Sequence, residues 1–581
     1  MNEKTEMPEK LPYSYHIFAW PFQIHGKNGG DMGTPESYVE ELTGKFKSGG
    51  WRELKAHEPA EPAATDEADK REELLDRFML WQYLSVAGQD IYEAVNPLPR
   101  SASEKESRNI CRILRLQLDK GGNTSYAITR EEKAYQLRLE KVELHVYKFG
   151  CGILFLYTEN RKYPDIQDIQ HIADYGRRIA LPFLPRKPGG FILTADVLKL
   201  EIPDLKFKNS EKSVSPCLDF RNLEKEYNDR KKEVNARFLQ DLVEADSVDI
   251  VPFTDDRMFE VELIRSDKLS GALKNDWRNN TELQKTLYSL IFVDEGGPTC
   301  QDGTMRSGLL KDAIDPRWAD EGTIHAATEF SMLCLTSNSD GILDSVIRPF
   351  TVEYPYLVSL VLAQRTGLAG YSEAAGHLAG KNVSLFTWRH HLIQLQKDFN
   401  VFRNQIMIPE ITNQDQGIEI YDLLRKQTRV REQENLLDDQ LEDLFDVADA
   451  NFQTVLTWVA LVFAVVSPFV EGFFAPLMED WGKVGGGPLF ALLGLLLFFG
   501  CYMARKETRK KRIFGFWDSF LKKRGNLILS CIGLLMDFFA LVAGFWNFFQ
   551  KEQDSFPDEQ RIQARYEEEQ RTEETSANEM G

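Results

Sequence analysis

The sequence predicts an α+β (mixed α/β) cytosolic domain, a long stalk helix and a C-terminal α-helical transmembrane region of two to three helices. Three observations carry this prediction. Strand-like and helix-like patterns alternate over residues 1–380, an apolar stripe with steps of three and four follows, and long apolar runs without Lys or Arg come last. At 581 residues the chain is also too long to fold around a single hydrophobic core, so two or three folding units are expected beside the membrane part.

Composition limits the classes of protein that fit. The formal net charge of -20 argues against a nucleic-acid-binding surface, because neutralising phosphates needs clustered Lys and Arg. The seven cysteines show no C-x-x-C pair and no zinc spacing, which is typical of free thiols in a reducing compartment. The N-terminus lacks the basic and apolar regions of a signal peptide. Most of the chain is therefore expected in the cytosol, without direct nucleic-acid binding.

Residues 1–380 are expected to form the cytosolic α/β domain. Its first strand carries alternating aromatic residues, and we expect a break in it at Pro21 because proline cannot donate to a sheet ladder. Strand-like runs lie at 13–25, 249–253, 258–264, 287–293 and 329–335, with a hairpin at 141–157. Helical patterns lie at 74–84, after an exposed disordered loop at 55–70, then at 164–181, and as two helices between 354 and 403 with a break near 376–382.

No catalytic constellation stands out in this domain, so no enzymatic activity is predicted. His390 and His391 are adjacent, and adjacent helical positions point about 100° apart, so a surface or core pair is favoured over a metal site. Arg177 and Arg178 lie near the end of a predicted helix and are candidates for binding an anionic ligand. A favourable positive charge at the C-terminal end of that helix is the simpler alternative.

A helical region and acidic stalk are predicted over 381–452. The apolar stripe begins at Ile420 and continues to Gly472 with one skip, and no proline interrupts the run between Pro409 and Pro468. One helix without a break is therefore predicted from 417 to 476. Acidic side chains that would attract cations crowd its last soluble turns, although a solvated helix face explains them equally well. These are Asp438, Asp439, Glu442, Asp443, Asp446 and Asp449.

The stalk stripe also predicts assembly. Leu437, Leu441 and Leu444 lie on an otherwise charged helix, and we expect that one subunit alone does not hide them. A cyclic homo-oligomer is the predicted partner arrangement.

Two transmembrane helices are predicted within 453–504, because both runs lack Lys and Arg and approach the length that spans a bilayer. The basic linker 505–525 places the stalk side in the cytosol by the positive-inside rule. Residues 526–549 are predicted as a third membrane helix, with a helix lying in the inner interface as the alternative. An acidic disordered tail is predicted over 550–581.

Four residues are candidates for lining a pore. Asn451 is on the apolar stripe together with Val455, and a polar amide there either fixes helix register or lines a water-filled path. Glu471, next to Gly472, is costly if it faces lipid and useful if it faces ions. The alternative is that Glu471 reaches the lipid headgroups.

The order of an α/β domain, a long stalk, a short acidic external loop and a second span ending in basic residues resembles the CorA family of divalent-cation transporters. The resemblance is best over residues 380–512. The Gly-Met-Asn signature of the family is absent, since residues 471–476 read Glu-Gly-Phe-Phe-Ala-Pro. The segments 16–22 and 409–421 resemble those of a divergent subgroup of enlarged CorA-like proteins. This subgroup includes the membrane effectors of type III CRISPR systems.

The resemblance implies a channel or effector in a prokaryotic inner membrane, gated through the cytosolic domain by a nucleotide messenger made from S-adenosylmethionine and ATP. It also implies a pentamer and contact with divalent cations such as Mg²⁺, with no tightly bound cofactor. Two alternatives stay open: a housekeeping Mg²⁺ or divalent-cation transporter, and a membrane-tethered scaffold without a pore.

Overall fold

The computed structural model describes residues 11–27, 35–45, 50–56, 67–98, 109–118, 124–180, 194–203, 211–213, 236–254, 257–275, 277–380 and 385–479. The chain divides into two compact units, Met1–Val459 and Ala460–Gly581. Most of the predicted disordered loop lies outside the described residues, but its last four residues, 67–70, are helical, so the prediction is wrong there. The second predicted span, the basic linker, the third membrane helix and the acidic tail also lie outside the described residues.

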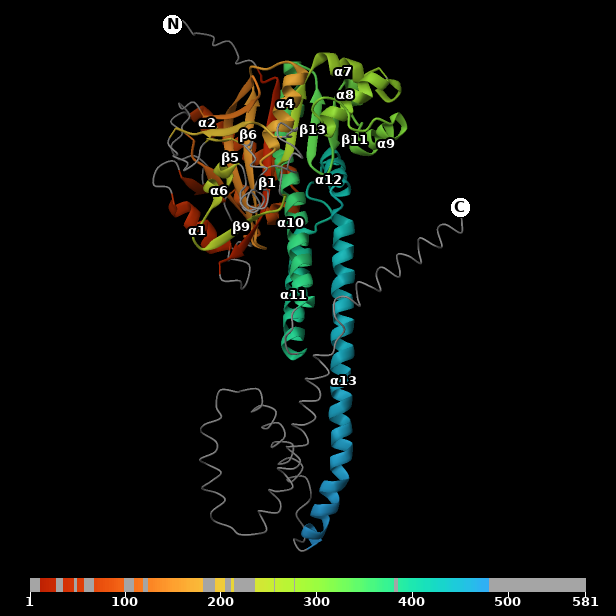
Figure 1. The fold of residues 1–581 in the computed structure, drawn as a ribbon. Helices are drawn as coiled ribbons and strands as arrows, with labels where there is room; N and C mark the ends of the chain where they lie inside the picture. Colours follow the sequence, from red (N-terminus) through yellow and green to blue (C-terminus); the bar gives the residue numbers. More distant parts are fainter. Residues whose placement is uncertain are drawn as a thin grey trace, which may run out of the picture. The chain divides into compact units, whose positions relative to one another are not determined.

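Strands of the first unit form one mixed sheet in the order β11-β12-β13-β10-β1-β6-β5-β4-β7-β8, with β2 and β3 attached through β5, and β9 attached to β1 (Figure 1). Of the pairs between strands, β10 with β13 is parallel, and the remaining named pairs are antiparallel. The strands are β1 Ser14–Gly26, β2 Trp51–Glu53, β3 Cys111–Leu116, β4 Ser125–Arg130, β5 Lys133–Tyr147, β6 Cys151–Asn160, β7 Val197–Glu201, β8 Glu211–Ser213, β9 Val248–Pro252, β10 Phe259–Arg265, β11 Ile314–Asp315, β12 Ile324–Ala327 and β13 Ser331–Thr336.

Helices cover both faces of this sheet (Figure 1). One face packs on α10, and the other packs on α4 beside the group of α7, α8 and α9. The helices are α1 Pro35–Lys45, α2 Glu67–Tyr83, α3 Val86–Ile91, α4 Ile166–Arg177, α6 Arg237–Val243, α7 Asp267–Leu273, α8 Thr281–Ile291, α9 Gly303–Ala313, α10 Tyr354–Ala379, α11 Leu385–Ile406, α12 Asp415–Gln427 and α13 Val430–Glu479.

The central strand β1 runs through Pro21 without interruption, so the predicted break in this strand is wrong. The interruption occurs in its neighbours instead. On one side of β1, pairing with β10 ends at Ala19 and pairing with β9 begins at Phe22. Pro21 falls in the gap between these two ladders, where its missing N–H costs the sheet little.

Local signals placed several other elements correctly. The predicted hairpin is β5–β6, which turns through Gly150 at a φ of 78°, in the left-handed region that glycine adopts easily. The helix α4 begins after Asp165, whose carboxylate accepts the Gln167 N–H as an N-cap. It approaches β1 closely at Gly176, where an added Cβ would come within 2.7 Å of the Phe18 ring.

One predicted strand is wrong. Residues 287–293 were expected to be extended, but most of them belong to helix α8, which ends at Ile291. A short apolar run has no period that separates a buried strand from a buried helix. The N-cap decides the matter, because the Asn280 side chain accepts the Leu283 N–H and starts the helix before the apolar run.

The longest buried helix is α10, which packs on β1 and β6. Judged by length and apolar composition, one helical stretch among the described residues, Leu343–Ala379, could cross a membrane, and 72% of its most apolar window is buried inside the structure. A helix that is apolar on all sides is typical of a core position as well as of a membrane span.

The predicted unbroken stalk contains a joint. Helix α12 ends at Gln427 and α13 begins at Val430, with Arg429 between them at a φ of 55°. A left-handed residue cannot continue a right-handed helix, so the prediction of one helix from 417 is wrong. The skip in the apolar stripe, between Gln427 and Leu437, spans this joint.

Candidate functional site

The first part of the stripe on α13 is covered within the same chain. Leu437 and Leu441 are 2% and 3% exposed, and they join the core that contains Phe399 and Phe402 of α11. Helices α11 and α13 run side by side (Figure 1). Leu444 is half-buried against the same core. The expectation that one subunit does not hide these three leucines is therefore wrong, and they give no argument for assembly.

Arginines of α11 hold the two helices together at the solvent edge. Arg403 forms ion pairs with Glu434 at 2.9 Å and with Asp438 at 2.7 Å. Arg389 pairs with Asp449 at 3.1 Å. Each pair is partly exposed, so it contributes on the order of 0.5 kcal/mol and mainly fixes the register of the two helices.

The six candidate acids of the stalk are therefore not equivalent. Two of them, Asp438 and Asp449, are neutralised by α11. The remaining four side chains are exposed on the other sides of α13 and are the ones whose field reaches solvent: Asp439, Glu442, Asp443 and Asp446.

The pore candidates lie on α13. The Asn451 side chain is exposed and the Val455 side chain is half-buried. Glu471 and Gly472 belong to the same helix by their backbone, but their side-chain surroundings lie outside what the structure describes.

The anion candidates Arg177 and Arg178 sit at the C-terminal end of α4, and both are engaged by one carboxylate. Arg178 Nε donates to Asp174 Oδ1 at 2.9 Å, and an Arg177 nitrogen donates to the same oxygen at 3.4 Å and to the Val293 carbonyl at 3.2 Å. The two arginines are 2% and 7% exposed, and burial lowers the pKa of Arg177. Neither guanidinium offers an open anion site on the surface of the described chain.

His390 and His391 are exposed, with ring centroids 6.2 Å apart. Among the described residues, the geometric groups that could hold a metal ion do not include them.

A hydrogen-bond chain joins the sheet to the start of α10. His145 Nδ1 lies 2.7 Å from Ser359 Oγ, which lies 2.7 Å from the Tyr147 hydroxyl. That hydroxyl lies 2.7 Å from the Tyr92 hydroxyl, which donates to the Tyr356 carbonyl at 2.8 Å. If each group donates to the next, from the imidazole N–H to the carbonyl, every hydroxyl both donates and accepts.

We call these hydrogen-bonded groups the sheet–α10 network. The side chains of its members, His145, Ser359, Tyr147 and Tyr92, are fully buried. Burial lowers the pKa of His145 to about 4, so the imidazole is neutral near pH 7. In the direction of donation described above, the neutral imidazole carries its proton on Nδ1, and its Nε2 has no hydrogen-bond partner among the described residues. Removing a partner from one of the paired groups would leave a second buried polar atom unpaired, which is costly.

A buried carboxylate stands beside the network. Glu143 accepts from Arg115 at 2.8 Å and from the Tyr157 hydroxyl at 3.0 Å, and Lys141 lies 3.3 Å away. Burial alone would raise the pKa of Glu143, but Lys141 and Arg115 outweigh it and hold this pKa well below its usual range. The sheet therefore carries a permanently ionised group under α10.

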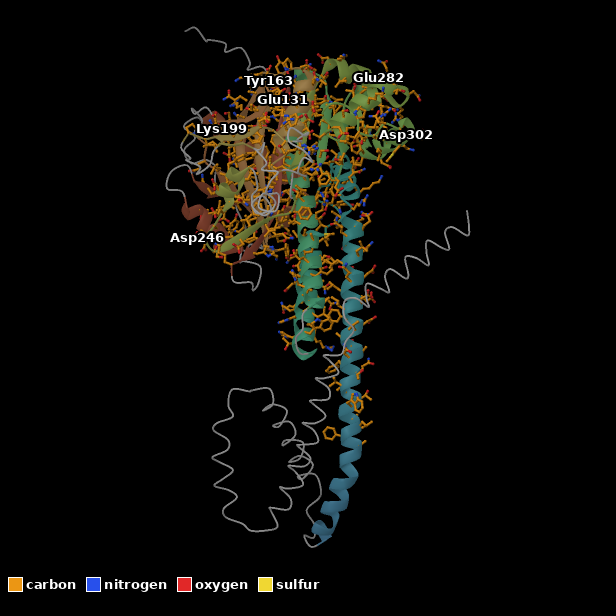
Figure 2. All side chains as sticks on the ribbon, in the orientation of Figure 1. Glu131, Tyr163, Lys199, Asp246, Glu282 and Asp302 are labelled. Atoms are coloured by element: carbon orange, nitrogen blue, oxygen red, sulfur yellow. The ribbon has the colours of Figure 1, made fainter. Side chains whose placement is uncertain are left out.

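Sequence reasoning missed these groups. Glu143, His145 and Tyr147 alternate with apolar residues along β5, and such alternation is typical of a solvated face. The buried groups contrast with Glu131, Asp246, Glu282 and Asp302, whose exposed side chains are labelled in Figure 2.

Comparison with models of protein families, with curated proteins and with solved structures finds no match to this chain.

Proposed function

We propose that the chain is one subunit of an oligomeric, CorA-like membrane channel or effector that is gated through its cytosolic domain. In this proposal the chain spans a prokaryotic inner membrane several times and forms a cyclic homo-oligomer, a pentamer if it follows the family it resembles. The gating ligand is a nucleotide messenger made from S-adenosylmethionine and ATP, and the biological role is antiviral defence with a type III CRISPR system.

The observation that carries the proposal is the continuity of α13. This helix starts against α11 and extends over 50 residues, which is about 75 Å at 1.5 Å per residue. Its exposed side chains change along its length from acidic, as at Asp443 and Asp446, to apolar, as at Leu456 and Leu461. An acidic stretch that passes into an apolar one suits a helix that leaves water and enters lipid.

The route of coupling in this proposal follows contacts of the first unit. The sheet–α10 network joins β5 to the first turn of α10, α10 packs on α11, and the arginines of α11 pair with α13. A displacement of the sheet would therefore reach α13 through packed and hydrogen-bonded groups, because close-packed elements transmit strain.

The ligand class in the proposal comes from the family resemblance, and Arg177 and Arg178 give it no support because Asp174 occupies them. The described part of the chain offers no other arginine pair that we assign to a phosphate.

Ion flux from liposomes that hold the purified full-length protein tests the proposal. We expect cation flux that begins on addition of the messenger made from S-adenosylmethionine and ATP, and no response to AMP or to S-adenosylmethionine alone. Flux of Mg²⁺ that is constant without any nucleotide would favour the transporter alternative. Absence of flux under every condition would favour the scaffold, and either result would overturn the proposal.

A further inference from the structure

A cluster of one imidazole and two carboxylates lies inside the sheet, away from the sheet–α10 network. Strands β1 and β10 are antiparallel neighbours with His16 opposite Glu262 and Phe18 opposite Glu260. Because every second residue of a strand faces the same way, His16, Glu260 and Glu262 project from one face of the sheet. Phe18 projects from that face too and meets Gly176 of α4, so the three groups lie on the face that α4 covers.

The three side chains lie close together, with one ligand atom of each within 4.8 Å of the others. His16 Nδ1 lies 2.9 Å from Glu260 Oε1 and 3.6 Å from Glu262 Oε1. His16 and Glu260 are 0% exposed and Glu262 is 2% exposed.

Two carboxylate oxygens of the cluster lack hydrogen-bond partners among the described residues: Glu260 Oε2 and Glu262 Oε1. The arginine whose charge acts on Glu262 is Arg177, but its hydrogen bonds go to Asp174 and to the Val293 carbonyl. Buried carboxylate oxygens that are left unpaired are costly, and such groups are usually paired or coordinate a metal.

The separations suit a metal ion. Bonds of about 2.1 Å to nitrogen and oxygen place neighbouring ligand atoms about 3.0 to 3.4 Å apart in octahedral or tetrahedral sites. The distances of 2.9 and 3.6 Å from His16 Nδ1 bracket this range. The three ligand atoms all lie within 4.8 Å of one another, so one ion reaches each of them after small side-chain adjustments.

The other nitrogen of the imidazole is oriented by a second hydrogen bond. Ser14 Oγ lies 2.9 Å from His16 Nε2 and accepts from Asn160 Nδ2 at 3.0 Å. When Nε2 carries the proton and donates it to Ser14, the lone pair of Nδ1 is free for a metal. Histidine ligands in proteins are commonly oriented in this way by a partner on the second nitrogen.

We propose that His16, Glu260 and Glu262 form a binding site for one divalent first-row transition-metal ion, which joins β1 to β10. An imidazole with two carboxylates suits Zn²⁺, Fe²⁺ or Mn²⁺ better than Mg²⁺, which prefers oxygen ligands and retains its water. The positive charge of the ion neutralises the two buried carboxylates. The ion also gives their oxygens the partner that no hydrogen bond provides. This site is separate from the stalk and from any ion that crosses the membrane, so it stands independently of the proposed function.

Metal titration of the full-length protein in detergent tests the site. The probes are Zn²⁺ and Co²⁺, added to chelator-treated protein in millimolar Mg²⁺, so that surface carboxylates are occupied by Mg²⁺. We expect one retained Zn²⁺ or Co²⁺ per chain and an imidazole nitrogen in the X-ray absorption spectrum of the bound Co²⁺. Glu260→Gln and Glu262→Gln should each weaken binding at least about tenfold, because each removes a ligand.

The matched control is Glu353→Gln, which changes a buried glutamate outside the cluster and should leave the affinity unchanged. Hydrogen–deuterium exchange on the parent protein gives an answer even if a variant fails to fold. Zn²⁺ should slow exchange in peptides that cover residues 14–19 and 259–264. No retained ion, unchanged exchange in these peptides, or a Zn²⁺ affinity in both cluster variants equal to that of the parent protein would overturn the proposal and leave a proton shared between the carboxylates.

Discussion

At the scale of single residues, Glu353 is a buried acid whose protonation affects stability. It ends the π-helical turn Pro349–Glu353 before α10 and is 7% exposed. Burial raises the pKa of Glu353 from 4.5 to about 7. A raised folded-state pKa means that the folded protein holds the proton more tightly, so this contribution to stability is present below about pH 4.5 and is lost as the pH rises through about 7.

We expect Glu353→Gln to raise the free energy of unfolding at pH 8 by on the order of 2 kcal/mol and to change it little at pH 5. The amide stays neutral at both pH values, so it avoids the cost of an ionised buried carboxylate. Urea unfolding at the two pH values measures the difference. A gain of the same size at pH 5 and pH 8 would show that protonation of Glu353 is not the cause.

Ser359 is the side chain of α10 that contacts both His145 and Tyr147. Ser359→Ala leaves their N–H and O–H groups without this partner inside the core. We expect a loss of about 1 to 3 kcal/mol in the free energy of unfolding. Ser372→Ala, on the same helix but in a more exposed position, is the control and should cost less than about 0.5 kcal/mol. Equal losses in the two variants would show that the sheet–α10 network does not contribute to stability.

At the scale of elements, the pairing of α11 with α13 depends on apolar burial rather than on the visible ion pairs. Leu441 is 3% exposed, so we expect Leu441→Ala to cost about 2 to 4 kcal/mol. Leu436 is 61% exposed on the same helix, and Leu436→Ala should stay within about 0.5 kcal/mol of the parent. Hydrogen exchange of the α13 amides reports the difference. Similar exchange in both variants would mean that α11 does not hold α13.

The elements show which sequence signals were sufficient. The β5–β6 hairpin and α4 follow from local chemistry, a left-handed glycine at Gly150 and an N-cap at Asp165, so periodicity and turn residues predicted them. The sequence around the joint at Arg429 contains no Gly, Pro or Asn, the residues that usually mark the end of a helix. The only sign in the sequence was the skip in the stripe after Gln427, which a helical pattern alone does not explain.

The candidate site was harder to predict for a physical reason. The sequence shows two adjacent basic residues, Arg177 and Arg178. It does not show that Asp174, one turn earlier on α4, forms ion pairs with both guanidinium groups, or that the fold buries both side chains. Likewise, the sequence shows that the stripe at Leu437 and Leu441 is apolar. Whether it packs on a second subunit or on α11 depends on tertiary contacts that no local pattern contains.

At the scale of the whole molecule, the exposed acids of α13 are expected to concentrate cations if the chain forms a channel. We predict that Asp443→Asn combined with Asp446→Asn lowers cation flux into liposomes, and more so at low ionic strength, because salt screens exposed charges. Asp438→Asn is the control and should have a smaller effect, since Arg403 already neutralises Asp438 at 2.7 Å. Flux that is unchanged at low salt would leave these acids as a solvated helix face.

In the proposed function, α13 carries a movement of the folded domain to the membrane. Ser372 of α10 and Gln440 of α13 are hydrogen-bonded at 3.2 Å, so cysteines at both positions can be bridged by a short bifunctional thiol reagent that reductant removes. We predict that the bridge abolishes nucleotide-stimulated ion flux and that reductant restores it, while either single cysteine variant and the parent protein respond normally. Equal nucleotide-stimulated flux with and without the bridge would contradict the claim.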